Sequence, residues 1–136
     1  MRLKILSFIT YKNKFLLLRN NPDPVHGPSK WFTVTGSVEE GENLEDAVAR
    51  EIKEETNLDI LKAIPLNTFS EYYSNFDKEM CKEHNFVSIA KDDNVALDNI
   101  EQIEYEWVSI DEYIDRIWWN EDKVKLKKDI LEKLKF

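Results

Sequence analysis

The most informative part of this 136-residue chain is residues 36–58, which read G-S-V-E-E-G-E-N-L-E-D-A-V-A-R-E-I-K-E-E-T-N-L. It opens with two of the chain's three glycines, and this spacing predicts a tight loop over residues 35–42. Residues 43–57 predict a helix, because apolar side chains recur on one helix face. A loop that enters a helix N-terminus presents free backbone N–H groups to an anion, so this segment indicates a phosphate-binding turn.

Carboxylates lie on the helix face that should turn toward the protein. At about 100° per residue, Glu51 and Glu55 share the direction of the apolar stripe, and Glu54 lies beside them. Two such charges at ~4 Å and an effective dielectric of ~20 repel by about 4 kcal/mol before relaxation. A divalent cation reverses the sign of this interaction, so the pattern indicates a metal site. The alternative is a solvated acidic face, since the chain has 27 Asp and Glu residues.

The composition limits the partners. One domain over residues 1–136 is expected, because a chain of this length buries its apolar residues around a single core. The net charge is −8 and the pI is about 4.8, which argues against generic nucleic-acid binding. A phosphorylated ligand would then need a divalent metal to neutralise it.

The sequence also predicts the compartment. Cys81 is the only cysteine, which excludes an intramolecular disulfide and suits a reducing cytoplasm. The apolar N-terminal run is too short for a signal peptide, and no stretch is long enough to span a bilayer. We therefore expect a cytoplasmic protein without a membrane partner.

The remaining segments predict a mixed α/β domain. Loops are expected over 20–30 and 74–83, and Pro65 is expected to interrupt the third long strand. Strands are expected over residues 3–10, 15–19, 31–34, 61–73, 85–90 and 105–109, and helices over 111–117 and 123–135. Such an order predicts an α/β sandwich, with helices on both faces of a mixed sheet.

Residues 36–58 resemble the Nudix box, G-x5-E-x7-R-E-U-x-E-E-x-G-U, where U is aliphatic. Eight of its nine defined positions match. Asn57 stands where the family has glycine, just past the helix end, and asparagine is the next-best residue for a left-handed conformation there. The resemblance implies a Nudix-type α/β/α sandwich in which the box forms loop, helix and loop.

The resemblance also implies roles for the charged residues of the box. Glu51, Glu54 and Glu55 are expected to bind Mg²⁺, with Mn²⁺ as a substitute. One of them, with Glu51 favoured, is expected to deprotonate the attacking water. Arg50 is expected to orient the carboxylates, supported by Glu42.

Two further ligands are expected around the metal. The Gly36 or Thr35 carbonyl is one candidate. Family members often add an acid from outside the box, and Glu101 is the candidate here, with Glu104 behind it. An ordinary polar loop is an equally good interpretation of these two acids in so acidic a chain.

The substrate class follows from residues 31–42, which look most like the dihydroneopterin triphosphate and dATP pyrophosphohydrolase branch of the family. This resemblance implies cleavage of a nucleoside triphosphate or a dihydroneopterin triphosphate-like substrate to a monophosphate and pyrophosphate. The alternatives are a hydrolase of dinucleotide polyphosphates or nucleoside diphosphate sugars, a non-catalytic nucleotide-binding module, and an acidic interaction domain with an accidental box. Many family members dimerise, so a homodimer is possible.

Contacts to the substrate are expected around the loop before the box. The candidates are Arg19, Lys30, Trp31, Thr35 and Gly36. His26 lies in the same loop, but a lone loop histidine is usually only solvated. Trp118 and Trp119 precede the last helix and are expected to pack that helix against the domain.

Overall fold

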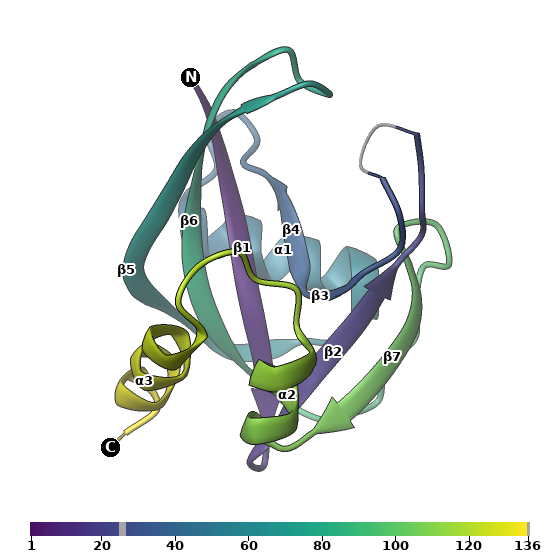
Figure 1. The fold of residues 1–136 in the computed structure, drawn as a ribbon, viewed down its shortest axis with the longest axis vertical. Helices are drawn as coiled ribbons and strands as arrows, with labels where there is room; N and C mark the ends of the chain where they lie inside the picture. Colours follow the sequence, from purple (N-terminus) through teal and green to yellow (C-terminus); the bar gives the residue numbers. More distant parts are fainter. Residues whose placement is uncertain (25–26, 136) are drawn as a thin grey trace.

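The computed structural model describes residues 1–24 and 27–135, and His26 lies outside them. The strands, shown in Figure 1, are β1 (Arg2–Tyr11), β2 (Lys14–Asn20), β3 (Trp31–Phe32), β4 (Val34–Ser37), β5 (Ile60–Ser74), β6 (Glu79–Ala90) and β7 (Gln102–Val108). The helices are α1 (Leu44–Thr56), α2 (Ile110–Arg116) and α3 (Lys123–Lys133). No helix among the described residues has the length and apolar character needed to cross a membrane.

Strand β1 is the centre of a mixed sheet with the order β3-β2-β1-β6-β5. It pairs in parallel with β6 and antiparallel with β2. The turn between β1 and β2 is Lys12-Asn13, and both residues have positive φ. Strand β4, which contains the first two residues of the box, also pairs with β1, and β7 pairs with β2.

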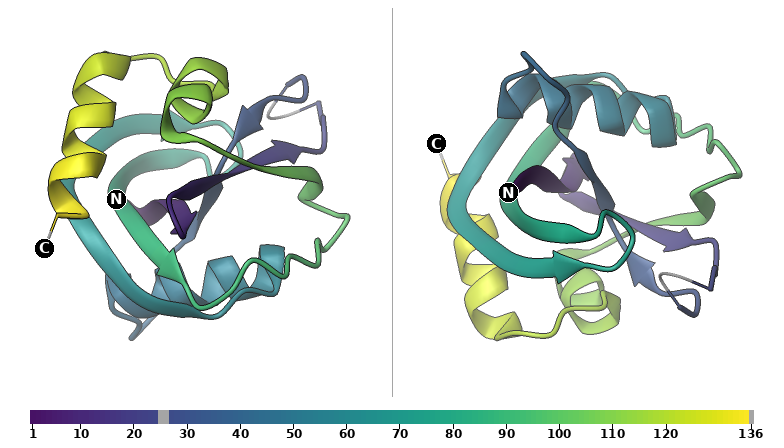
Figure 2. Two further views of the ribbon diagram at one scale, coloured as in Figure 1. Left: turned by 90° about the horizontal axis from the view of Figure 1, so that it is seen from below. Right: turned by 90° about the horizontal axis from the view of Figure 1, so that it is seen from above.

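Helices cover both faces of this sheet, which confirms the predicted sandwich. Helix α1 lies on one face, and α2 and α3 lie on the other (Figure 2). One apolar core packs β1 and β2 against α1, around Val48 and Ile52. A second core packs the opposite face against α2 and α3, around Phe8, Tyr113 and Ile130.

Two expectations for β5 and β6 differ from the structure. The predicted loop over 74–83 is mostly strand, because β5 and β6 form one long hairpin closed by residues 75–78. Its polar side chains indicated a loop, but a two-stranded hairpin end can expose both faces to water. Pro65 does not end β5: it lies in an edge strand, where a missing N–H is tolerated, beside a register shift.

The glycine loop of the box also begins later than predicted. Residues 34–37 continue as β4 against β1, so the loop starts at Val38 and Gly36 lies inside a strand. Helix α1 then begins after Asn43, whose side chain accepts the Asp46 N–H at 2.8 Å. It ends at Asn57 with φ 63°, which confirms the predicted left-handed residue there.

Candidate functional site

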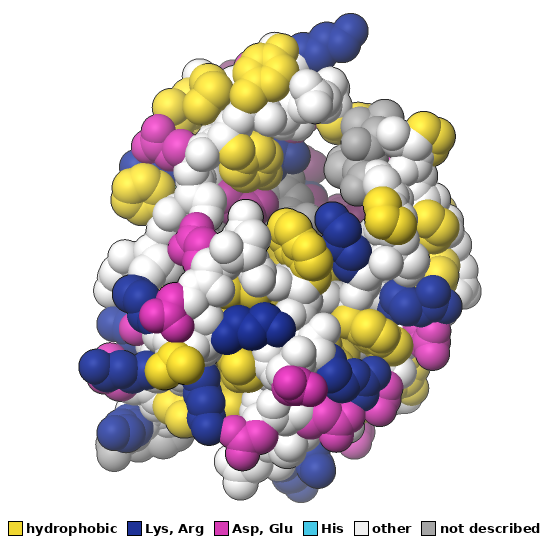
Figure 3. Space-filling view, in the orientation of Figure 1, with side chains coloured by type: hydrophobic (Ala, Val, Ile, Leu, Met, Phe, Trp, Pro, Cys, Tyr) yellow, Lys and Arg dark blue, Asp and Glu magenta, His cyan; other side chains and the backbone are white. Residues whose placement is uncertain are grey.

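A cleft of about 850 Å³ opens beside the box. Its walls come from β1, β4, α1, the β5–β6 hairpin and the segment that precedes α3. Figure 3 shows this face of the molecule hollowed, with charged side chains inside the hollow. The cleft thus joins the box to segments far from it in the sequence.

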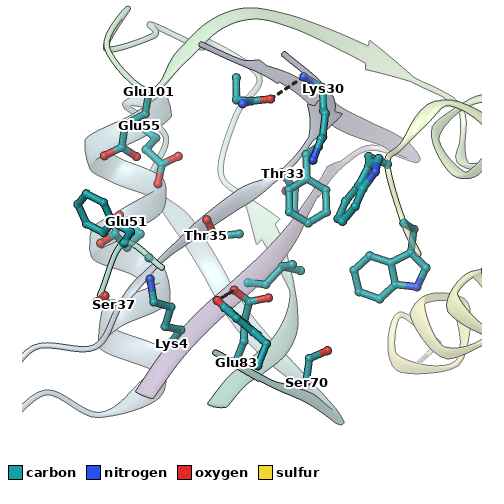
Figure 4. Close-up of a pocket in the computed structure, with 18 of the residues that line it drawn as sticks. Lys4, Lys30, Thr33, Thr35, Ser37, Glu51, Glu55, Ser70, Glu83 and Glu101 are labelled. Atoms are coloured by element: carbon teal, nitrogen blue, oxygen red, sulfur yellow. Dashed lines mark hydrogen bonds between the residues drawn. The ribbon is translucent and has the colours of Figure 1, made fainter. Parts of the chain in front are cut away.

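Three carboxylates meet in the cleft. Glu51 and Glu55 come from successive turns of α1, and Glu101 comes from the residue before β7. One oxygen from each lies within 4.8 Å of the others (Figure 4). The Asp98 carboxylate shapes the segment that carries Glu101, because its Oδ1 accepts the Glu101 and Gln102 N–H groups at 3.1 and 3.0 Å. This donor set is the kind that Mg²⁺ prefers.

Glu55 has the features of a cation ligand. Its side chain is buried, with 2% of the residue exposed, and Gln102 Nε2 donates to its Oε1 at 2.9 Å. Its Oε2 is buried and accepts no hydrogen bond within the described residues. Burial raises the pKa of Glu55 to about 10, the Gln102 hydrogen bond opposes this, and the negative charges of Glu101 and Glu51 add to it. A bound cation would both neutralise this carboxyl and occupy the unused oxygen.

Arg50 ties the box together. Its Nε and Nη2 donate to the two Glu42 oxygens at 2.8 and 2.9 Å, and Nη2 also donates to the Ser37 carbonyl at 2.9 Å. Its Nη1 donates to Glu51 Oε1 at 2.9 Å. Hydrogen bonds from Arg50, and one from the Glu39 N–H, hold the pKa of Glu42 at about 2. The guanidinium therefore links the loop to the carboxylate that faces the cleft.

Not all of the predicted site residues meet in the cleft. Lys30, Thr35 and Gly36 line it. Glu54 does not line it: its side chain is 56% exposed and lies 3.4 Å from Arg50 Nη1. Arg19 and Trp31 also lie outside the lining, and Arg19 Nε donates to Glu104 Oε1 at 2.6 Å.

One expectation about the tryptophans was wrong. Both tryptophans line the cleft, but Trp119 also packs against the core that holds α3, whereas Trp118 is 44% exposed. Its ring meets Phe32 edge-on at a centroid distance of 5.6 Å, and Lys30 Nζ lies 4.2 Å from its centroid. Nothing in the local sequence separates the two tryptophans, because only the path of the loop between α2 and α3 decides which one reaches the core.

Sequence reasoning missed Lys4 and Glu83, which also line the cleft. Lys4 stands near the start of a strand, where a lysine in the sequence is typical of a solvated charge, but only 17% of its side chain is exposed. Glu83 fell in a predicted loop, but it lies in β6 and is paired in register with Lys4. Burial raises the pKa of Glu83, while the hydrogen bond from the Tyr72 hydroxyl lowers it.

Gly36 is expected to matter because it lets Glu51 approach β4. A Cβ at Gly36 would overlap the Glu51 carboxyl group. Gly36→Ala is expected to displace that carboxylate and lower kcat about 10- to 100-fold. The free energy of unfolding should change by only about 1 kcal/mol, since the displaced group ends a flexible side chain. Steady-state kinetics and urea denaturation measure the two effects.

Gly41 gives the matched control for that substitution. It has φ 79° and no atom near the position of a Cβ. Gly41→Ala should lower the free energy of unfolding by about 1–2 kcal/mol and leave kcat nearly unchanged. Equal kcat losses in the two variants would contradict the proposed contact between Gly36 and Glu51.

Comparison with known proteins identifies the family. The NUDIX domain matches residues 2–130. The dihydroneopterin triphosphate diphosphatase of Escherichia coli K12 is 44% identical over 48 residues, which span 35% of this chain and only 29% of that protein. The same figures hold for the enzyme of that name from Shigella flexneri.

Solved structures share this fold over nearly the whole chain. A MutT protein from Methanosarcina mazei Go1 is 24% identical, with 98% of this chain and 96% of that chain covered and a TM-score of 0.72. An Ap4A hydrolase from C. elegans is 21% identical, with coverage of 97% and 96% and a TM-score of 0.74. The E. coli dihydroneopterin triphosphate pyrophosphohydrolase is 22% identical, with coverage of 96% and 92% and a TM-score of 0.68. The match over residues 2–130, together with this fold, shows that the chain belongs to the NUDIX domain family.

Proposed function

We propose that this protein is a Mg²⁺-dependent pyrophosphohydrolase. It cleaves a diphosphate linkage in a nucleoside triphosphate or a dihydroneopterin triphosphate-like substrate and releases a monophosphate and pyrophosphate. The observation that carries this proposal is the cluster of Glu51, Glu55 and Glu101 in the cleft. Nudix hydrolases generally need a divalent metal, and the cluster offers three carboxylate ligands for such an ion.

The residues present fit such an ion. Glu51, Glu55 and Glu101 are the proposed ligands, joined by the Gly36 carbonyl, and Mn²⁺ is the expected substitute. Glu54 remains a proposed ligand only from the resemblance to the box, since its side chain is 56% exposed and lies outside the cleft lining. When bound, the ion would lower the pKa of a water molecule and neutralise charge on the phosphates.

The protein's own groups position the reaction. Glu51 is the proposed base that accepts a proton from the attacking water, and its hydrogen bond from Arg50 fixes one of its oxygens. Gln102 fixes Glu55 in the same way from the opposite wall. Glu42 acts through Arg50, so it is a positioning residue, and the backbone of Thr35 and Gly36 is the proposed phosphate contact.

The end of the cleft away from the carboxylates favours a substrate that contains a flat ring. Phe32 and Trp118 present aromatic surface there, and Lys30 adds a cation beside Trp118. The match to dihydroneopterin triphosphate diphosphatases, although partial, favours a pterin or a purine as this ring. Arg19 and Trp31 are left out of the proposed substrate site, since they do not line the cleft.

The cellular setting stays a prediction. The single cysteine favours the cytoplasm, and the net charge of −8 disfavours a nucleic-acid partner. A homodimer is likewise predicted only because many family members dimerise, and light scattering of the purified protein would test it.

The test is product release from a panel of triphosphates, diphosphates, dinucleotides and nucleotide sugars, with Mg²⁺ and with EDTA. We expect pyrophosphate release from a triphosphate with Mg²⁺ and none with EDTA. Release from dinucleotides alone would favour the alternative hydrolase. No release from any compound by the folded, Mg²⁺-bound protein would contradict a catalytic role and favour a binding module.

A further inference from the structure

Lys4 places a cation on the floor of the cleft beside the carboxylate cluster. In β1 it is paired in register with Ser37 of β4 and with Glu83 of β6, so it lies between the strand that enters the box and the hairpin. Figure 4 shows its amine pointing into the cleft on the side of Glu51 and Ser37. Only 17% of its side chain is exposed, and its Nζ lies 2.9 Å from Asp77 Oδ2.

The charge balance of the cleft makes this amine important. Among the described residues, two lysines line the cleft, Lys4 and Lys30. Against them stand the carboxyl groups of Asp23, Glu51, Glu55, Glu71, Glu83, Glu101 and Glu121. A polyphosphate needs cations along its length, and a metal at the cluster would neutralise only the phosphates that it contacts.

The two lysines lie at different ends of the cleft. Lys30 lies over Trp118, at the aromatic end. Lys4 lies across the cleft from Lys30, on the side of Glu51 (Figure 4). A substrate whose ring rests at Trp118 and whose phosphates pass the carboxylates would therefore end at Lys4.

We infer that Lys4 binds the terminal phosphate of the substrate, in the part that leaves as pyrophosphate, and so selects a triphosphate over a diphosphate. This inference rests on the proposed function. Lys4 would exchange Asp77 for the phosphate. Asp77 would keep a cationic partner, because Arg2 Nε lies 3.3 Å from its Oδ1.

A purely structural role for Lys4 makes a different prediction. Asp77 lies in the turn of the β5–β6 hairpin, where its N–H donates to Ser74 Oγ at 3.0 Å. If Lys4 only anchors this turn, Lys4→Met and Asp77→Asn should lose the same stability and activity. If Lys4 binds phosphate, Asp77→Asn frees the amine, and KM for the triphosphate stays the same or falls.

Steady-state kinetics on the best triphosphate of the panel and its diphosphate give the first test. We expect Lys4→Met to raise KM for the triphosphate about 10- to 100-fold, the effect of losing one charge-assisted hydrogen bond. KM for the diphosphate should change little, and Lys4→Arg should restore part of the loss. Arg2→Met is the matched control, since Arg2 contacts the same Asp77 but does not line the cleft. An equal rise for both substrates would overturn the inference.

Calorimetric binding of inorganic pyrophosphate with Mg²⁺ tests Lys4 without turnover. Binding should weaken about 10- to 100-fold in Lys4→Met and stay unchanged in Arg2→Met. Unchanged binding in Lys4→Met, or no binding to the wild type, would overturn the inference. Lys4-dependent binding without any hydrolysis would overturn the proposed function and support the phosphate site. Hydrolysis that is insensitive to Lys4→Met would support the proposed function and overturn the phosphate site at Lys4.

Discussion

Replacing Glu55 by glutamine is expected to lower kcat about 10³-fold and to raise the stability of the metal-free protein. The loss of activity follows from removing a proposed metal ligand, an interaction worth several kcal/mol in the transition state. The gain in stability follows from burial, because the wild-type carboxyl has an oxygen without a hydrogen-bond donor within the described residues. Glutamine keeps the shape and can still accept the hydrogen bond from Gln102.

The stability of the metal-free protein should also depend on pH through Glu55. The pKa of Glu55 in the folded state is about 10, against an ordinary pKa of 4.5 for a glutamate. Between these values the folded state holds a proton that the unfolded state has lost, so the stability of the metal-free protein falls as pH rises from about 5 to 10. The slope for one proton is at most about 1.4 kcal/mol per pH unit. Urea denaturation in EDTA should show this slope in the wild type and a flatter curve in Glu55→Gln.

Glu45→Gln is the matched control, since Glu45 is an exposed residue in the first turn of the same helix. It should change neither kcat nor the slope with pH. Added Mg²⁺ should stabilise the wild type more than Glu55→Gln. A Glu55→Gln protein that turns over normally, or that loses metal-free stability, would contradict the assignment of Glu55 as a metal ligand.

The helix of the box could be predicted because its signal is local. The spacing of Glu51 and Glu55 put both on the inward face, and the structure places both in the cleft. The same spacing left Glu54 at the edge, and the structure turns it to solvent. Even the left-handed end at Asn57 followed from one residue type at one position.

The rest of the cleft depends on contacts between distant segments. Lys4, Glu83 and Trp118 carry no local signal, because their places follow from the pairing of β1 with β6 and from the path of the loop before α3. The family resemblance points to Glu101, but the sequence around it is equally typical of an ordinary polar loop. The hydrogen bonds of Asp98 that carry its segment into the cleft have no sequence pattern of their own.

Replacing Arg50 by lysine is expected to impair stability and activity together. Lysine keeps the charge but cannot reproduce the fork that holds both oxygens of Glu42. We expect the free energy of unfolding to fall by about 2 kcal/mol, less than for a fully buried pair because the guanidinium is partly exposed. We expect kcat to fall about 10- to 100-fold, because Glu51 loses the partner that fixes its carboxylate.

Acid titration separates this network from an ordinary ion pair. The pKa of Glu42 in the folded state is about 2, below the ordinary glutamate pKa of 4.5. The stability that Arg50 provides is therefore complete above about pH 5 and is lost as pH falls toward 2. The difference in unfolding free energy between wild type and Arg50→Lys should therefore shrink over that range. Arg116→Lys is the control: Arg116 also binds two glutamates, but their side chains are 47% and 48% exposed, against 15% for Glu42. That variant should lose less than about 1 kcal/mol and no activity. If the two arginine variants lost the same stability and activity, Arg50 and Glu42 would form only an ordinary surface ion pair. Another group would then have to orient the Glu51 carboxylate.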